Sequence, residues 1–95
     1  MRSIFGVDPG LHVGLLHFRL DTRFVEMLEL GPLEAADWLH ARVSGGDFIA
    51  VERYTQTAGS AKRTRQNDAI EVIGMCRWIA HRNLAVILEQ GASEA

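Results

Sequence analysis

Two acidic residues, Asp8 and Glu52, each close a short apolar run, residues 4–7 in one case and 48–51 in the other. A carboxylate at the end of a buried strand is costly to remove from water, so two of them in one small chain need a common explanation. If the two runs are neighbouring parallel strands, their carboxyl ends lie about 4.8 Å apart, at the edge where open α/β sheets form ligand sites. A divalent cation, which prefers carboxylate oxygens, is the ligand that this pair predicts.

Each acid also has a plainer interpretation. Asp8 precedes Pro9-Gly10, and an aspartate in this place can serve only to form a turn. Glu52 precedes Arg53 and can be a surface carboxylate paired with it. The placement of both acids at strand ends favours the metal site over these alternatives.

The elements that must position the acids follow from the hydrophobic pattern and the turn residues. The expected strands are residues 3–8, 13–20, 24–30, 48–51 and 84–88, and the expected helices are 32–43 and 66–82. Tight turns join the first three strands and indicate an antiparallel meander. The run 48–51 lacks alternation, which predicts a central strand covered on both faces and, after a helical crossover, parallel to the first strand.

Length and composition indicate a single α/β domain over residues 1–95. Of the 95 residues 47% are hydrophobic and 23% charged, as in soluble globular proteins. The single cysteine, Cys76, rules out an internal disulfide, and the four histidines lack zinc-ligand spacing. No apolar run is long enough to cross a membrane, so we expect a cytoplasmic protein, of a bacterium or of a phage within its host. Cys76 is expected to be a small core residue, and Trp38 and Trp78 are expected to have a packing role on their helices, with stacking on nucleic acid as the alternative.

The net charge of −2 hides a basic segment between Arg53 and Asn67, which contains no acid. Local cation density governs affinity for a nucleic-acid backbone, so this segment is a candidate DNA contact. A solvated loop is the alternative. The candidate DNA-binding residues, including an aromatic ring that could stack on an unpaired base, are Arg53, Tyr54, Lys62, Arg63 and Arg65.

The first motif, Gly6-Val7-Asp8-Pro9-Gly10 with Gly14 on the return strand, resembles the opening motif of the RuvC-like Holliday junction resolvases of the RNase H-like superfamily. Residues 49–52 resemble the second acidic strand of that family. The resemblance implies a mixed five-stranded sheet in the order three strands, helix, strand, helix, strand. It also implies that Asp8 and Glu52 are catalytic ligands of Mg²⁺ or Mn²⁺.

The function implied by the resemblance is metal-dependent endonuclease cleavage of Holliday junctions or other branched DNA, in recombination, repair or phage DNA processing. The family has a further C-terminal helix with additional acids, and residues 89–95 are too few to form it. We therefore expect a truncated or naturally shortened domain with severely reduced activity. Glu89 or Glu94 could substitute for the missing acids.

A junction has two-fold symmetry, so symmetric cleavage favours a homodimer. The helix 66–82 has a wide apolar arc, and its possible dimer contacts are Ile70, Ile73, Met75 and Ile79. The alternative is that a further segment of the domain covers this arc.

Two other functions compete with the nuclease. A branched-DNA-binding or assembly module derived from a resolvase would keep the fold and the basic segment without a complete set of acids. An actin-like nucleotide-binding module would need a hydroxyl or lysine in the first hairpin to hold phosphate, and Leu11-His12-Val13 provides neither.

Overall fold

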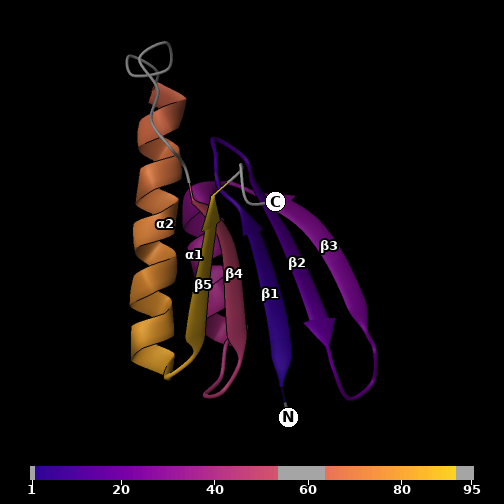
Figure 1. Cartoon of the computed structure of the whole chain (residues 1–95). Helices are drawn as coiled ribbons and strands as arrows, with labels where there is room; N and C mark the ends of the chain where they lie inside the picture. Colours follow the sequence, from indigo (N-terminus) through magenta and orange to yellow (C-terminus); the bar gives the residue numbers. More distant parts are fainter. Residues whose placement is uncertain (1, 54–63, 92–95) are drawn as a thin grey trace.

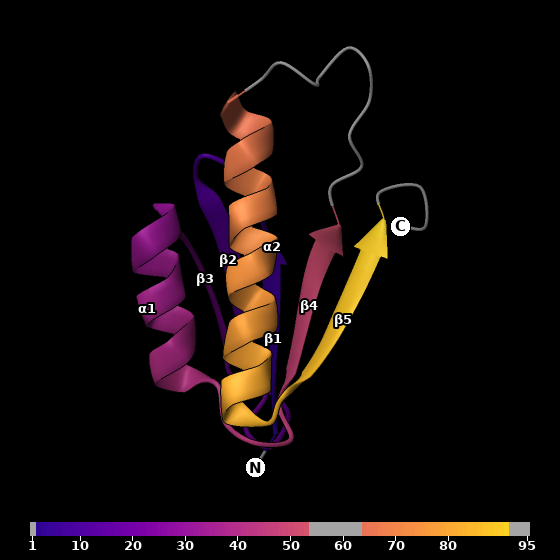
Figure 2. The same cartoon turned by 90° about the vertical axis from the view of Figure 1, so that its left-hand side faces the viewer.

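The chain forms one five-stranded sheet with both helices on the same face (Figure 1, Figure 2). The structure, a computed structural model, describes residues 2–53 and 64–91, with the backbone alone at 53, 64–69 and 91. Its elements are β1 (Ser3–Asp8), β2 (Val13–Arg19), β3 (Val25–Leu30), α1 (Pro32–Arg42), β4 (Phe48–Arg53), α2 (Thr64–Asn83) and β5 (Val86–Gly91). This order confirms the predicted α/β class and the predicted succession of elements.

The sheet order is β3-β2-β1-β4-β5, so the first strand lies at the centre. β1 pairs antiparallel with β2, and β2 pairs antiparallel with β3, which confirms the meander. β4 runs parallel to β1, and β5 runs parallel to β4. The carboxyl ends of β1 and β4 therefore meet at one edge of the sheet, as the sequence predicted.

The core lies between the sheet and the helices, with α1 over β2 and β3 and α2 over β4 and β5. Strand alternation sends one set of side chains toward the helices, and the core of this set on β1, β2 and β4 consists of six hydrophobic residues that are at most 4% exposed: Phe5, Val7, Val13, Leu15, Ile49 and Val51. Trp38 packs edge-on against Phe5, and Cys76 is fully buried, as predicted. Trp78 is 55% exposed and lies outside the core, with its ring centroid 5.6 Å from that of His40 of α1.

The opposite face of the sheet is open in the described part of the chain. Apolar side chains are exposed on it, including Met27 at 75% and Leu88 at 52%. On β4, Ile49 and Val51 are buried under α2, whereas Phe48 and Ala50 are only partly covered. The expectation that this strand is covered on both faces is therefore wrong for the described residues, because both helices pack on one side.

The end of α2 differs from the prediction and changes the last strand. Leu84 adopts a left-handed conformation (φ 58°), and the N–H of Ala85 donates to the carbonyl of Ala80 at 2.9 Å, which closes the helix in a Schellman-type turn. The strand consequently starts at Val86 and runs to Gly91, later than the predicted 84–88. Glu89 and Gln90 thus belong to the sheet and not to a polar tail.

The predicted dimer contacts on α2 divide into two kinds. Ile73 and Ile79 are 5% and 1% exposed within the chain and pack in the core, so their assignment to a dimer surface is wrong. Ile70 is 49% exposed and Met75 is partly buried at the edge of the core. In the described part of the chain, neither helix has the length and hydropathy of a membrane span.

Candidate metal and DNA site

Asp8 and Glu52 lie next to each other at the carboxyl ends of the paired strands β1 and β4. Asp8 is the last residue of β1, and Glu52 is the residue before the last of β4. Val7 pairs with Val51, and each acid is the next residue of its strand. Since Val7 and Val51 point toward the helices, alternation sends both carboxylates to the open face. The parallel pairing predicted from the sequence thus places the two acids side by side.

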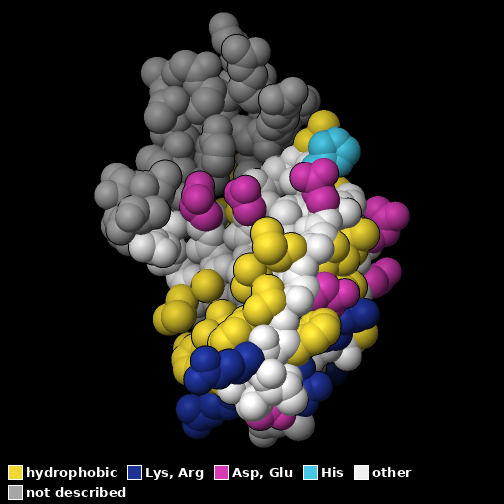
Figure 3. Space-filling view, turned by 90° about the vertical axis from the view of Figure 1, so that its right-hand side faces the viewer, with side chains coloured by type: hydrophobic (Ala, Val, Ile, Leu, Met, Phe, Trp, Pro, Cys, Tyr) yellow, Lys and Arg dark blue, Asp and Glu magenta, His cyan; other side chains and the backbone are white. Residues whose placement is uncertain are grey.

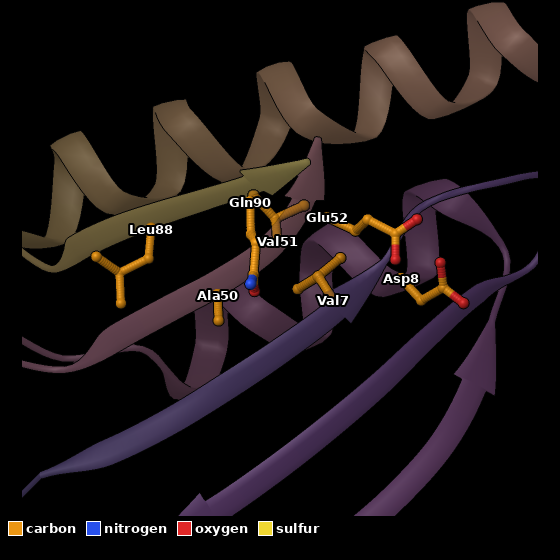
Figure 4. A pocket seen from close by; sticks show the side chains of 7 residues that line it. All are labelled: Val7, Asp8, Ala50, Val51, Glu52, Leu88 and Gln90. Carbon is orange, nitrogen blue, oxygen red and sulfur yellow. The ribbon is translucent and has the colours of Figure 1, made fainter. Parts of the chain in front are cut away.

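The two acids share a cavity of about 270 Å³ at the carboxyl edge of β1, β4 and β5. It is lined by Val7, Asp8, Ala50, Val51, Glu52, Leu88 and Gln90. Figure 4 shows the Glu52 carboxylate extending toward Asp8, with Ala50 and Leu88 farther toward the starts of β4 and β5, on the left of the view. Among the described residues, the cavity opens onto the face of the sheet opposite the helices.

Both carboxylates are exposed, which corrects one premise drawn from the sequence. Each apolar run is buried, but its acid is the residue at which the strand leaves the core. No desolvation cost therefore requires a cation here. The reason to associate the two acids is their shared placement in one cavity.

Strand pairing places one residue from each of the five strands in a row at this edge of the sheet. Gln90 pairs with Glu52, and on the other side Asp8 pairs with Gly14, which pairs with Glu29. Acidic side chains lie in a row above the hydrophobic middle of this face in Figure 3, with Lys and Arg side chains below. Gln90 and Glu29 were not predicted as site residues. The alternation of side chains along a strand is the signal that could have indicated on which side of the sheet they lie.

A second, shallower hollow of about 400 Å³ lies on the other side of Asp8. The residues that line it include Gly6, Asp8, Gly14 and Met27. A Cβ added at Gly14 would come 3.4 Å from the Asp8 Cβ, so the absence of a side chain at this position keeps the space beside the carboxylate open.

Glu89 cannot be the substitute acid that the sequence suggested. It lies on the helix side of β5, where its two carboxylate oxygens accept hydrogen bonds from Arg77 of α2 at 2.6 and 2.7 Å. This pairing raises the pKa of Arg77 and keeps Glu89 away from the open face. Glu94 lies outside the described residues.

The candidate DNA-binding residues fall largely outside the described side chains. Arg53 ends β4 and Arg65 lies in the first turn of α2, where the backbone alone is described. Tyr54, Lys62 and Arg63 lie outside the described residues. The assignment of these five residues to DNA binding stays a prediction.

Within residues 2–53 and 64–91, no three His, Cys, Asp or Glu side chains gather in a way that could hold a metal ion. Two carboxylates can still provide part of a Mg²⁺ or Mn²⁺ shell, because Mg²⁺ commonly keeps several waters and takes one or two carboxylates plus a substrate phosphate. The donor set therefore fits a hard cation that binds weakly until substrate is present.

Neither a protein-family model nor a curated protein matches this sequence. Among solved structures, the chain is similar to T. thermophilus RuvC in complex with a Holliday junction substrate, with a TM-score of 0.62 and 14% sequence identity. The match covers 96% of this chain and 66% of that chain. The likeness shows an RNase H-like fold of the RuvC kind, shared over about two thirds of the neighbour's length.

Proposed function

We propose that this protein is a metal-dependent, structure-selective endodeoxyribonuclease that acts on Holliday junctions or other branched DNA in the cytoplasm of a bacterium or of a phage-infected cell. One observation carries the proposal: Asp8 and Glu52 end adjacent parallel strands and line one open cavity. The RuvC-like fold supports it, because the similar structure holds a Holliday junction substrate.

In this proposal, Asp8 and Glu52 would hold Mg²⁺ or Mn²⁺, which would supply the Lewis acidity that phosphodiester hydrolysis needs. Asp8 borders both hollows, so it is the residue best placed to orient ligands on either side of it. The open face lets a DNA strand reach the carboxylates. The basic segment that begins at Arg53 would bind the phosphates on either side of the cleaved bond.

We also propose that two copies of the chain form the enzyme, with the exposed side of α2 as their contact. Ile70 and Met75 remain available for this contact, whereas Ile73 and Ile79 do not. A two-fold dimer would match the symmetry of a four-way junction.

The test is cleavage of a labelled four-way junction by the purified chain in Mg²⁺, in Mn²⁺ and in EDTA. We expect slow cleavage in Mn²⁺, none in EDTA, and loss of cleavage in Asp8→Asn and Glu52→Gln. Glu89→Gln is the matched control, because it neutralises an acid on the opposite side of the sheet and should cleave like the unaltered chain. Cleavage that Asp8→Asn leaves intact would refute the assignment of the site.

A non-catalytic branched-DNA-binding module is the second candidate, and the small set of ligands among the described residues favours it. In that case, junction binding survives Asp8→Asn, falls steeply as salt rises, and weakens in Arg63→Ala and Arg65→Ala. The two candidates separate on cleavage in Mn²⁺, which only the nuclease produces.

A further inference from the structure

Gln90 extends the candidate site onto a third strand. It lies beside Glu52 in the register of β4 and β5, and it lines the cavity that Asp8 and Glu52 share. Figure 4 shows its side chain above Ala50, on the same face as the two carboxylates. This placement arises because β5 continues to Gly91, so that alternation puts Glu89 toward α2 and Gln90 toward the open face.

Gln90 differs in chemical type from the other residues that line the cavity. Among the described residues that line the cavity, the others are carboxylates, Asp8 and Glu52, or hydrocarbon side chains. Carboxylates and phosphate oxygens are both acceptors, so among the described lining residues the Gln90 amide is the group that offers side-chain N–H donors. A phosphate held by a cation on the carboxylates still has oxygens that need donors.

We propose that Gln90 is a substrate-binding residue, whose side-chain N–H donates to a non-bridging oxygen of the DNA phosphate held at Asp8 and Glu52. This inference rests on the proposed function. A neutral amide suits the position, because a cationic side chain would compete with the metal for Glu52, and an acidic one would repel the phosphate.

The experiment separates metal binding from DNA binding in the full chain. Mn²⁺ affinity is measured by titration without DNA, and affinity for a labelled four-way junction is measured in Mn²⁺ and in EDTA. For Gln90→Leu, which replaces the amide with a shorter hydrocarbon side chain, we expect Mn²⁺ affinity within about twofold of the unaltered chain. We expect its metal-dependent gain in junction affinity to fall about tenfold, the effect of one hydrogen bond to a charged group.

For Gln90→Glu, which puts a third carboxylate beside Glu52, we expect several-fold tighter Mn²⁺ binding together with weaker junction binding. Glu89→Gln is the control on the opposite face of β5 and should change neither quantity. Thermal unfolding of each variant shows that the fold is retained.

Two results would overturn the inference while leaving the proposed function standing. One is a Gln90→Leu variant that keeps the full metal-dependent gain, and the other is a Gln90→Leu variant that loses Mn²⁺ as severely as Asp8→Asn does. If the unaltered chain binds no Mn²⁺ and Asp8→Asn changes nothing, the proposed function fails and the role of Gln90 fails with it.

Discussion

The imidazole of His17 stacks flat on Phe5, with ring centroids 4.4 Å apart, and its Nε2 lies 3.0 Å from the Ser3 hydroxyl. Burial lowers the pKa of His17 below its usual value, although the nearby Glu26 acts in the opposite direction. The unfolded chain therefore binds a proton at His17 more readily than the folded chain does. Protonation of this residue favours unfolding.

We predict that the free energy of unfolding falls as pH drops below about 6.5, the ordinary histidine pKa, through the lowered pKa of the folded state. Above pH 6.5 the contribution of His17 is fully present, because the ring is neutral in both states. Urea denaturation at pH 5, 6 and 7 measures the slope, and His17→Gln should flatten it. If the free energy of unfolding of His17→Gln depends on pH as steeply as that of the unaltered chain, groups other than His17 cause the pH dependence.

Cys76 is fully buried, and burial raises the pKa of its thiol to about 12. The thiolate is the reactive form, so the folded protein should resist alkylation by iodoacetamide at pH 8. In urea the thiol should react completely, and mass spectrometry distinguishes the two cases. Rapid alkylation of the folded chain would contradict the packing of α2 against the sheet.

At the scale of elements, Asp47 fixes how β4 enters the sheet beside β1. Its carboxylate, 3% exposed, accepts the N–H of Ser3 and the N–H of Ser44, each at 2.8 Å. These bonds tie the start of β1 to the connection between α1 and β4. Asp47 directly precedes β4, and its bond to Ser3 aligns the start of β4 with the start of β1. This alignment sets the register that places Asp8 beside Glu52.

We predict that Asp47→Ala lowers the free energy of unfolding by about 3 kcal/mol, because it leaves two backbone N–H groups without their acceptor. Asp47→Asn, which keeps one acceptor oxygen, should cost about half as much. Asp37→Ala, at an exposed position on α1, is the control and should stay within about 0.5 kcal/mol of the unaltered chain. Denaturant unfolding measures the free energy of unfolding of the three variants. An equal loss in Asp47→Ala and Asp37→Ala would show that the hydrogen bonds of Asp47 do not stabilise the fold.

At the scale of the whole molecule, exposed apolar side chains of the described residues occur on the open face of the sheet, with Met27, and on the outer side of α2, with Ile70. Exposed apolar patches mark interaction surfaces. The dimer proposal assigns association of the chain to α2 and leaves the sheet face to the DNA.

We predict that Ile70→Lys converts a dimer into a monomer, whereas Met27→Lys, which adds the same charge on the other surface, leaves the dimer intact. Both positions are exposed, so neither change should unfold the chain, unlike a charge at the core residue Ile73. Light scattering measures the mass of each variant. Loss of the dimer only in Met27→Lys would place the contact on the sheet face.

The sequence by itself determined the order of the elements, the parallel pairing of the two acidic strands and the meeting of Asp8 with Glu52. These features follow from hydrophobic period, turn residues and the handedness of crossovers, which are local properties or general rules of chain topology.

The tertiary structure decided which side of each element meets the core. It placed Ile73 and Ile79 inside and Trp78 outside, since the apolar arc of a helix does not say which part of it faces the sheet. It also extended β5 to Gly91, which places Glu89 beside Arg77 and Gln90 in the cavity. A shift of one residue in a strand exchanges its two faces, and only the packed register fixes that choice.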